Sequence, residues 1–199
     1  MKASVWTGFL WGLCEGLFFL IVPDVLLCFW ALKSWRHALI STLSVLLGTM
    51  SAACVIYILL RHDAYFYSAF PQLWSHIPGY RAKMLEVAAE HVSKFGGKGL
   101  LYGPSSGIAY RIYVLQAWRH DVSLGQVLLW TPFARLERIL IAPLATLLLR
   151  RGMEWLWITK LKKMDKATLN VALLLSVISY WIAIYIWYWG VFVPATYGL

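Results

Sequence analysis

The sequence feature that most constrains the fold is a pair of carboxylates inside an apolar stretch. Glu15 and Asp24 lie nine residues apart within the apolar run 5–32. In one unbroken helix they would point to opposite faces, about 13 Å apart, and one would face lipid. An acid in the bilayer interior costs on the order of 2.5–3.5 kcal/mol. Because Pro23 breaks a helix, the run is predicted to form a re-entrant hairpin that aims both acids at one interior point.

The composition is that of a membrane protein. Of the 199 residues, 61% are hydrophobic and 14% are charged, whereas about a quarter of a soluble domain is charged. The 12 Trp and 11 Tyr suit a molecule with two water interfaces. The net charge of +9 favours contact with anionic lipid headgroups over nucleic acid. We therefore expect a polytopic membrane protein that binds no nucleic acid.

Three segments are long enough to cross a hydrocarbon core of about 30 Å, namely 38–60, 122–149 and 169–193. The first contains many small residues that permit close packing against a neighbouring helix. Asp121 is expected to cap the second. The predicted fold class is all-α, with about three full spanning helices, two re-entrant hairpins and an interfacial helix in a single membrane-embedded domain over 1–199.

The interfacial helix and the second hairpin are predicted in the middle of the chain. The stretch 80–95 has apolar residues at helical spacing with charges on its other side, and Gly96-Gly97 follows it. This helix lies either on the membrane surface or on the protein itself. The apolar stretch 98–118 is interrupted by Gly103-Pro104-Ser105-Ser106-Gly107 and contains Arg111, so a second re-entrant hairpin is predicted there.

Charged residues interrupt the predicted span 122–149. Arg135 lies near its centre, with Arg138 three residues on. An interface would be about 15 Å away, too far for either side chain to reach easily, so both arginines are expected to face the protein interior. The stretch 150–166 is strongly basic and is predicted as a cytoplasmic loop, and 61–79 as an interfacial connection. Counting back from that loop, the two hairpins approach each other from opposite faces of the membrane.

The order of these segments resembles the DedA family, whose core is also called the VTT or SNARE-associated domain. In that family an early hairpin has a glutamate followed, nine residues on, by an acid beside a Pro/Gly turn, and Glu15 and Asp24 have this spacing. Its second hairpin follows an aromatic-Gly-Gly element and has a Gly-Arg…Pro-Gly-x-Arg pattern, of which 95–111 looks like a degenerate form. Arg111 matches the second family arginine, whereas Pro104 stands at the first.

The resemblance implies a multi-pass protein of the bacterial inner membrane. Such proteins move lipid-linked phosphates, for example undecaprenyl phosphate, or phospholipids between leaflets, and proton coupling has been proposed for some members. The implied partners are anionic or polyprenyl phosphate headgroups and protons. A phosphate would bind Arg111, and Arg135 or Arg138, through charge-assisted hydrogen bonds. Glu15 and Asp24 would be the proton-responsive members, and they need one of these arginines as a counter-charge.

Other interpretations stay open from the sequence. Glu15 and Asp24 could pair with Arg135 and Arg138 in a buried ion network that only fixes helix register. An intramembrane lipid-phosphate enzyme is a second alternative, although its only nucleophile signal is Ser105-Ser106 and no base is evident nearby. A non-transporting assembly or accessory protein is a third. We predict no enzyme, no cofactor and no metal site, since the histidines and cysteines lack paired-ligand spacing. A homo-oligomer is left open.

Overall fold

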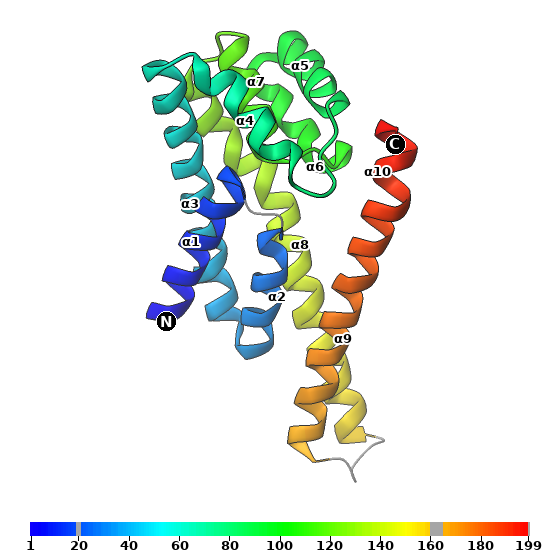
Figure 1. Cartoon of the computed structure of the whole chain (residues 1–199). Coiled ribbons are helices and arrows are strands. Elements are labelled where there is room, and N and C mark those ends of the chain that lie inside the picture. Colours follow the sequence, from blue (N-terminus) through cyan, green and yellow to red (C-terminus); the bar gives the residue numbers. More distant parts are fainter. Residues whose placement is uncertain (19–20, 160–164, 199) are drawn as a thin grey trace.

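All regular structure in the described part of the chain is helical (Figure 1). The computed structural model describes residues 1–18, 21–159 and 165–198, leaving aside the side chains at 137, 157–159 and 166. The predicted all-α fold is confirmed for these residues. The elements, in chain order, are α1 (Lys2–Leu17), α2 (Pro23–Lys33), α3 (Trp35–His62), α4 (Tyr65–Ser75), α5 (Lys83–Phe95), the 3-10 helix η1 (Gly96–Tyr102), α6 (Gly103–Ser106), α7 (Tyr110–Arg119), α8 (Leu124–Thr159), α9 (Lys166–Trp187), the π-helix η2 (Tyr188–Phe192) and α10 (Val193–Tyr197).

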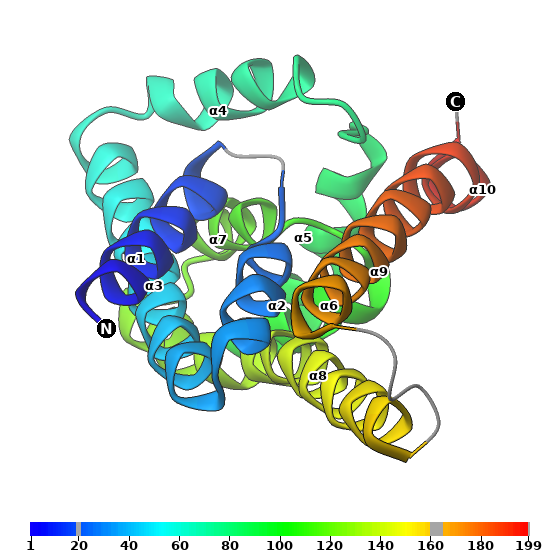
Figure 2. The ribbon, with the colours of Figure 1, turned by 90° about the horizontal axis from the view of Figure 1, so that it is seen from below.

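The first apolar run folds as two short antiparallel helices with a break between them (Figure 1). The helix α1 ends at Leu17, and Pro23 is the first residue of α2. Val22 is extended, with φ −62° and ψ 146°, because a proline disfavours the helical conformation of the residue before it. The predicted break is present, but it lies before Pro23, which starts the second helix. Seen from below, α2 lies between α1, α3, α8 and α9 (Figure 2).

Glycines bring α1 and α3 into backbone contact. A Cβ atom added to Gly12 would lie 2.2 Å from the carbonyl oxygen of Val45, and one added to Gly48 would lie 2.1 Å from that of Phe9. Small residues at such positions let helix backbones approach closely. The expected close packing of the segment 38–60 is therefore present, with α1 as the partner.

Among the described residues, two helical segments are long and apolar enough to cross a membrane, Trp35–His62 and Ala167–Tyr197. They contain the predicted spans 38–60 and 169–193. The second passes through α9, η2 and α10. The third predicted span, 122–149, overlaps α8 from Leu124 onward, and this helix has 36 residues and includes Arg135 and Arg138.

The helix α8 is longer than predicted. The stretch 150–159, expected to be loop, continues the helix to Thr159. Arg150 stabilises this extension, since its Nε donates to Glu154 Oε1 at 2.9 Å, one helical turn on. Its Nη1 also donates to the carbonyl oxygen of Leu32, at the end of α2. The rest of the predicted basic loop includes 160–164, which lies outside the described residues.

The predicted cap of α8 is also wrong. Asp121 has φ +54° and lies in the turn that ends α7, rather than at the start of the next helix. The Oγ of Ser123 instead accepts a hydrogen bond from the backbone N–H of Gln126 at 3.3 Å. A serine hydroxyl bonded to the amide three residues on is a typical N-cap.

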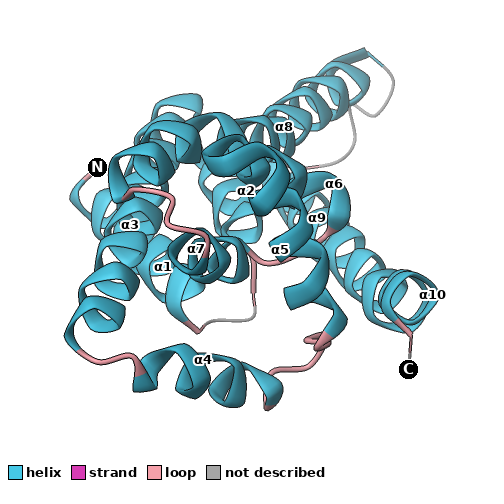
Figure 3. Cartoon of the chain, turned by 90° about the horizontal axis from the view of Figure 1, so that it is seen from above, coloured by secondary structure: helices cyan, strands magenta, loops and turns pink. Residues whose placement is uncertain are grey.

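The helices α4 and α5 belong to the upper part of the molecule, where α4 runs along one side (Figure 3). The helix α5 corresponds to the predicted helix in 80–95. Its apolar residues Met84, Ala88 and Val92 are buried and the helix contacts α7 and η1, so its apolar face packs on the protein itself. The helix α4 occupies part of the predicted connection 61–79, where a buried stack of Phe70 on Trp74, with ring centroids 5.4 Å apart, fixes it to the core.

The second Gly/Pro/Ser break lies where it was predicted. The short elements η1 and α6 lead into it, Gly107 turns the chain with φ +69°, and α7 leads away. Such a φ favours glycine. In Figure 1 the segment around α6 lies beyond the broken end of the α1–α2 pair. Residues of both breaks, Val22 and Pro23 in the first and Pro104 and Gly107 in the second, line one cavity, so the two breaks lie near each other.

Candidate functional site

The helix α8 presents two arginines to the α1–α2 pair. Arg135 and Arg138 are three residues apart, and residues at this spacing lie on one face of a helix. Both arginines contact an acid of the first hairpin. The side chain of Arg135 is only 11% exposed, whereas that of Arg138 is 41% exposed. Arg135 thus faces the interior as predicted, and Arg138 pairs inside the molecule while part of it borders an open space.

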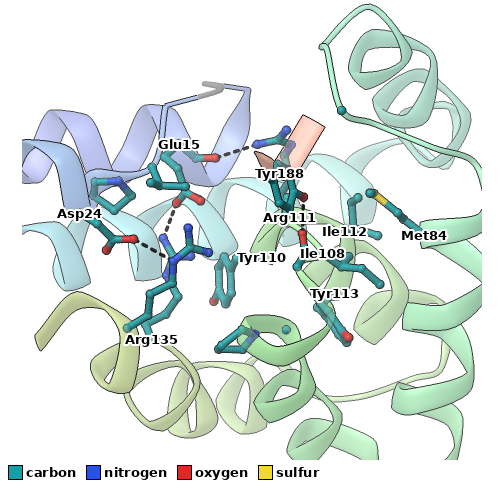
Figure 4. Close-up of a pocket in the computed structure, with 18 of the residues that line it drawn as sticks. Glu15, Asp24, Met84, Ile108, Tyr110, Arg111, Ile112, Tyr113, Arg135 and Tyr188 are labelled. Carbon is teal, nitrogen blue, oxygen red and sulfur yellow. Dashed lines mark hydrogen bonds and ion pairs between the residues drawn. The ribbon is translucent and has the colours of Figure 1, made fainter. Parts of the chain in front are cut away.

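Glu15 and Arg135 form a closed ion pair at the end of α1 (Figure 4). Arg135 Nη2 donates to Glu15 Oε2. The Arg135 guanidinium also lies over the ring of Tyr110, 5.5 Å from its centroid. The hydroxyl of Tyr110 is hydrogen-bonded to Thr131 Oγ1. Protein atoms therefore surround this pair, and Glu15 is 5% exposed.

Asp24 and Arg138 form the second ion pair. Arg138 Nε donates to Asp24 Oδ2 at 2.8 Å. Asp24 is 1% exposed, and no donor among the described residues reaches its other oxygen, Oδ1. A buried carboxylate oxygen without a donor is unfavourable, so this position suits a proton or a ligand hydrogen-bond donor.

Arg111 joins the site through a hydrogen bond to the backbone of α1. Its Nη1 donates to the carbonyl oxygen of Glu15 at 3.1 Å, as the dashed line in Figure 4 marks. Its guanidinium lies over the ring of Trp74, whose Nε1 in turn donates to the carbonyl oxygen of Leu17. A cation at the C-terminal end of α1 is stabilised by the helix dipole. This contact connects the second break to the first.

All five predicted site residues line one small cavity. Its volume is about 140 Å³, and its walls include Glu15, Asp24, Arg111, Arg135 and Arg138. Residues next to both breaks complete the wall, among them Val22, Pro104 and Gly107. The cavity therefore lies where the two broken segments meet α8 and α9.

The sequence did not indicate that tyrosines of the C-terminal segment belong to the site. The backbone N–H of Val22 donates to the Tyr185 hydroxyl at 2.9 Å. Tyr188 donates to the carbonyl oxygen of Gly107 at 2.6 Å, and Tyr197 to that of Ser106. The sequence analysis did not connect these tyrosines with the two breaks. The signal that was available is the spacing of 185 and 188, which places both rings on one face of the helix.

Ser106 lies in a short polar chain at the second break. Its Oγ is 3.1 Å from the Tyr113 hydroxyl, which is 2.8 Å from His91 Nδ1. His91 is partly buried in α5 and stacks on Tyr102, with ring centroids 4.6 Å apart. The tyrosine separates the serine from the histidine, so the three do not form a nucleophile–base pair. No group of three metal-ligating residues occurs in the described parts of the chain.

No family model, curated protein or solved structure matches this chain. The likeness to the DedA family therefore rests on the residues quoted above. A function for this chain is therefore inferred from the geometry of the site.

Proposed function

We propose that this chain is a polytopic membrane protein that moves a lipid-linked phosphate or a phospholipid between leaflets. Large apolar side chains are exposed along three helices, which is typical of a lipid-facing surface. They include Leu43 and Leu47 on α3, Leu144 and Leu148 on α8, and Leu175 and Ile186 on α9. The proposed location is the bacterial inner membrane.

The lengths of the first two helices support a re-entrant hairpin. The helices α1 and α2 have 16 and 11 residues, so they extend about 24 Å and 16 Å. Both are shorter than a hydrocarbon core of about 30 Å. A chain break within the bilayer requires partners for its free backbone groups. The Tyr185 hydroxyl supplies one at the α1–α2 break, and the Tyr188 hydroxyl supplies one at the second break.

The observation that carries the proposal is the cavity where the two breaks meet. It gathers two acids and three arginines inside an otherwise apolar molecule. Broken segments that meet around charged side chains form the substrate sites of many secondary transporters. Arginine guanidinium groups bind phosphate through charge-assisted, often bidentate hydrogen bonds.

We propose that the Asp24–Arg138 pair alternates with substrate. A proton on Asp24 would remove the charge that holds Arg138, and the guanidinium could then bind a phosphate. Loss of that proton would re-form the ion pair and favour release of the phosphate. The other charged groups near Asp24 are Arg135 and Glu15, which neutralise each other. Transport of this kind depends on pH.

Reconstitution in liposomes tests this function. Purified protein should accelerate the movement of a fluorescent undecaprenyl phosphate or phospholipid between leaflets without changing it chemically. Asp24→Asn should abolish the pH response, and Glu15→Gln should reduce transport. Glu86→Gln, at an exposed position of α5 that forms none of the ion pairs described above, serves as the matched control. Full transport and an unchanged pH response in both acid variants would remove the acids from the mechanism.

The same experiment separates the alternatives. Formation of a dephosphorylated or transferred product would indicate an enzyme. Neither movement nor product would favour an accessory protein. If the acid variants lose stability but those that fold transport normally, the ion pairs only fix helix register.

A further inference from the structure

A second, larger cavity lies between α8 and α9. Its volume is about 740 Å³, which is within the usual range of about 300–1,000 Å³ for small-molecule sites. It shares Asp24, Pro104 and Arg138 with the smaller cavity. From there it continues between the two helices, past Ala142 and Val177, to Leu149.

The wall of this cleft is suited to hydrocarbon. Its α8 side is a stripe of mainly apolar residues that begins at Arg138. Two of the hydroxyls that border it are already bonded to their own helices, because Thr146 donates to the Ala142 carbonyl at 2.9 Å and Ser176 to the Ala172 carbonyl at 2.8 Å. Neither hydroxyl requires water.

The length of the cleft matches one leaflet. Arg138 and Leu149 are eleven residues apart on α8, which corresponds to about 16 Å of helix. Half of a hydrocarbon core of about 30 Å is about 15 Å. A lipid chain that starts at Arg138 and follows α8 would therefore reach the edge of the leaflet near Leu149.

The polar end of the cleft identifies the kind of lipid. The Arg138 side chain lines the cleft and is 41% exposed, although its Nε is bonded to Asp24. A cation at the inner end of an apolar cleft is complementary to an anionic headgroup with a hydrocarbon tail. Inorganic phosphate alone would leave the apolar wall uncovered.

We propose that the cleft between α8 and α9 binds one hydrocarbon chain of the lipid whose phosphate binds Arg138. This inference rests on the proposed lipid transport and adds the route by which the tail remains in an apolar environment while the headgroup enters the protein. The tail lies along the α8 stripe, and the headgroup lies between Arg138 and Pro104.

Photo-cross-linking tests the position of the chain. The probe is phosphatidic acid with a diazirine in the middle of one acyl chain, in phosphatidylcholine vesicles that contain the full-length protein. Mass spectrometry should map adducts to the cleft, at Ala142, Ala145 or Val177. Ala145→Trp, which fills the cleft from an exposed position, should reduce these adducts at least tenfold. The control Leu140→Trp, at an exposed position on the opposite face of the same helix, should leave them unchanged.

Competition experiments and a second variant that fills the cleft complete the cross-linking test. Excess inorganic phosphate should not compete with the probe, whereas unlabelled phosphatidic acid should. Ala142→Phe replaces Ala145→Trp if the tryptophan variant does not fold. Adducts spread over the outward faces of α3 and α9 with none enriched in the cleft, or cleft adducts that both filled variants retain, would overturn the proposal.

The experiments distinguish an error in this inference from an error in the proposed lipid transport. If the protein translocates lipid but Ala145→Trp translocates it equally well and no adducts form in the cleft, the chain follows another path and only this inference fails. If adducts form in the cleft and no lipid crosses the membrane, the cleft is a lipid site and the transport function fails.

Discussion

The two ion pairs have the same composition and very different surroundings. Each joins an acid of the α1–α2 hairpin to an arginine of α8. Around Glu15–Arg135 the protein is closed, with Tyr110 beneath the guanidinium. At Asp24–Arg138 the acid is buried, but the arginine borders the cleft and is 41% exposed. A closed pair can fix the position of a helix, whereas an open one can exchange its partner for a ligand.

The packing of the helices around the two ion pairs differs in the same way. On the side of Glu15, α1 and α3 are in backbone contact through Gly12 and Gly48. On the side of Asp24, a cavity of about 740 Å³ separates much of α8 from α9. Tightly packed interfaces resist rearrangement, and loosely packed ones open at low cost. The α1–α3 side is therefore expected to be the fixed part of the molecule, and α9 the part that moves.

Arg135→Met should have the largest effect on stability. It leaves the Glu15 carboxylate buried without its counter-charge, and loss of one partner of a buried pair costs about 3–5 kcal/mol. The free energy of unfolding, followed by thermal unfolding in detergent, should fall by that amount. The double variant Glu15→Gln with Arg135→Met should recover part of it. A loss no larger than that of Arg151→Met, an exposed arginine on the same helix, would contradict the closed character of this pair.

Whereas Arg135→Met mainly lowers stability, Arg138→Met should impair lipid transport more than it lowers the free energy of unfolding. Its unfolding free energy should fall by only about 1–3 kcal/mol, because the cleft admits water to the remaining carboxylate. Lipid transport should nevertheless be lost, since the accessible guanidinium is gone. Arg138→Lys keeps the charge and should retain only part of the transport, because an ammonium lacks the planar fork of donors. If Arg135→Met and Arg138→Met lower stability equally, the two pairs do not differ as described.

Gly12→Ala tests the fixed side without touching a charge. The new methyl group would lie 2.2 Å from the Val45 carbonyl oxygen, so α1 and α3 must separate. Overpacking of this kind costs about 1–3 kcal/mol. Gly152→Ala is the matched control, because nothing lies within 4 Å of the added methyl, and it should stabilise α8 by up to about 1 kcal/mol. Equal melting temperatures for the two variants would show that the α1–α3 contact is not tight.

The sequence predicts most of the fold and the members of the site. Hydropathy locates α3 and α9, and the Gly, Pro and Ser residues locate both breaks. The acids and arginines could be placed together because the interior of a membrane protein leaves a buried charge few alternatives to another charge. These predictions use patterns along the sequence and the free-energy cost of an unpaired buried charge.

What the sequence did not predict depends on three-dimensional packing. It could not assign Glu15 to Arg135 and Asp24 to Arg138, because the pairing depends on how α2 sits against α8. It did not find the tyrosine hydroxyls that bind the two breaks, since aromatic residues near a helix end are equally typical of a membrane interface. The exposure of Arg138 was not predicted, because the sequences of two helices do not show whether an open cleft lies between them.

Pro104→Arg tests whether the Asp24–Arg138 pair has a role in binding phosphate that the Glu15–Arg135 pair lacks. Pro104 stands where the DedA family has its first arginine, and it borders both cavities together with Arg138. If Arg138 supplies from α8 the charge that the second break lacks, an arginine at position 104 should restore part of the transport lost in Arg138→Met, with little effect on stability. It should not rescue Arg135→Met, whose defect is structural. Ser105→Arg, at the neighbouring position that lines only the larger cavity, is the control. Rescue of both arginine variants, or of neither, would mean that the open pair has no separate role in binding phosphate.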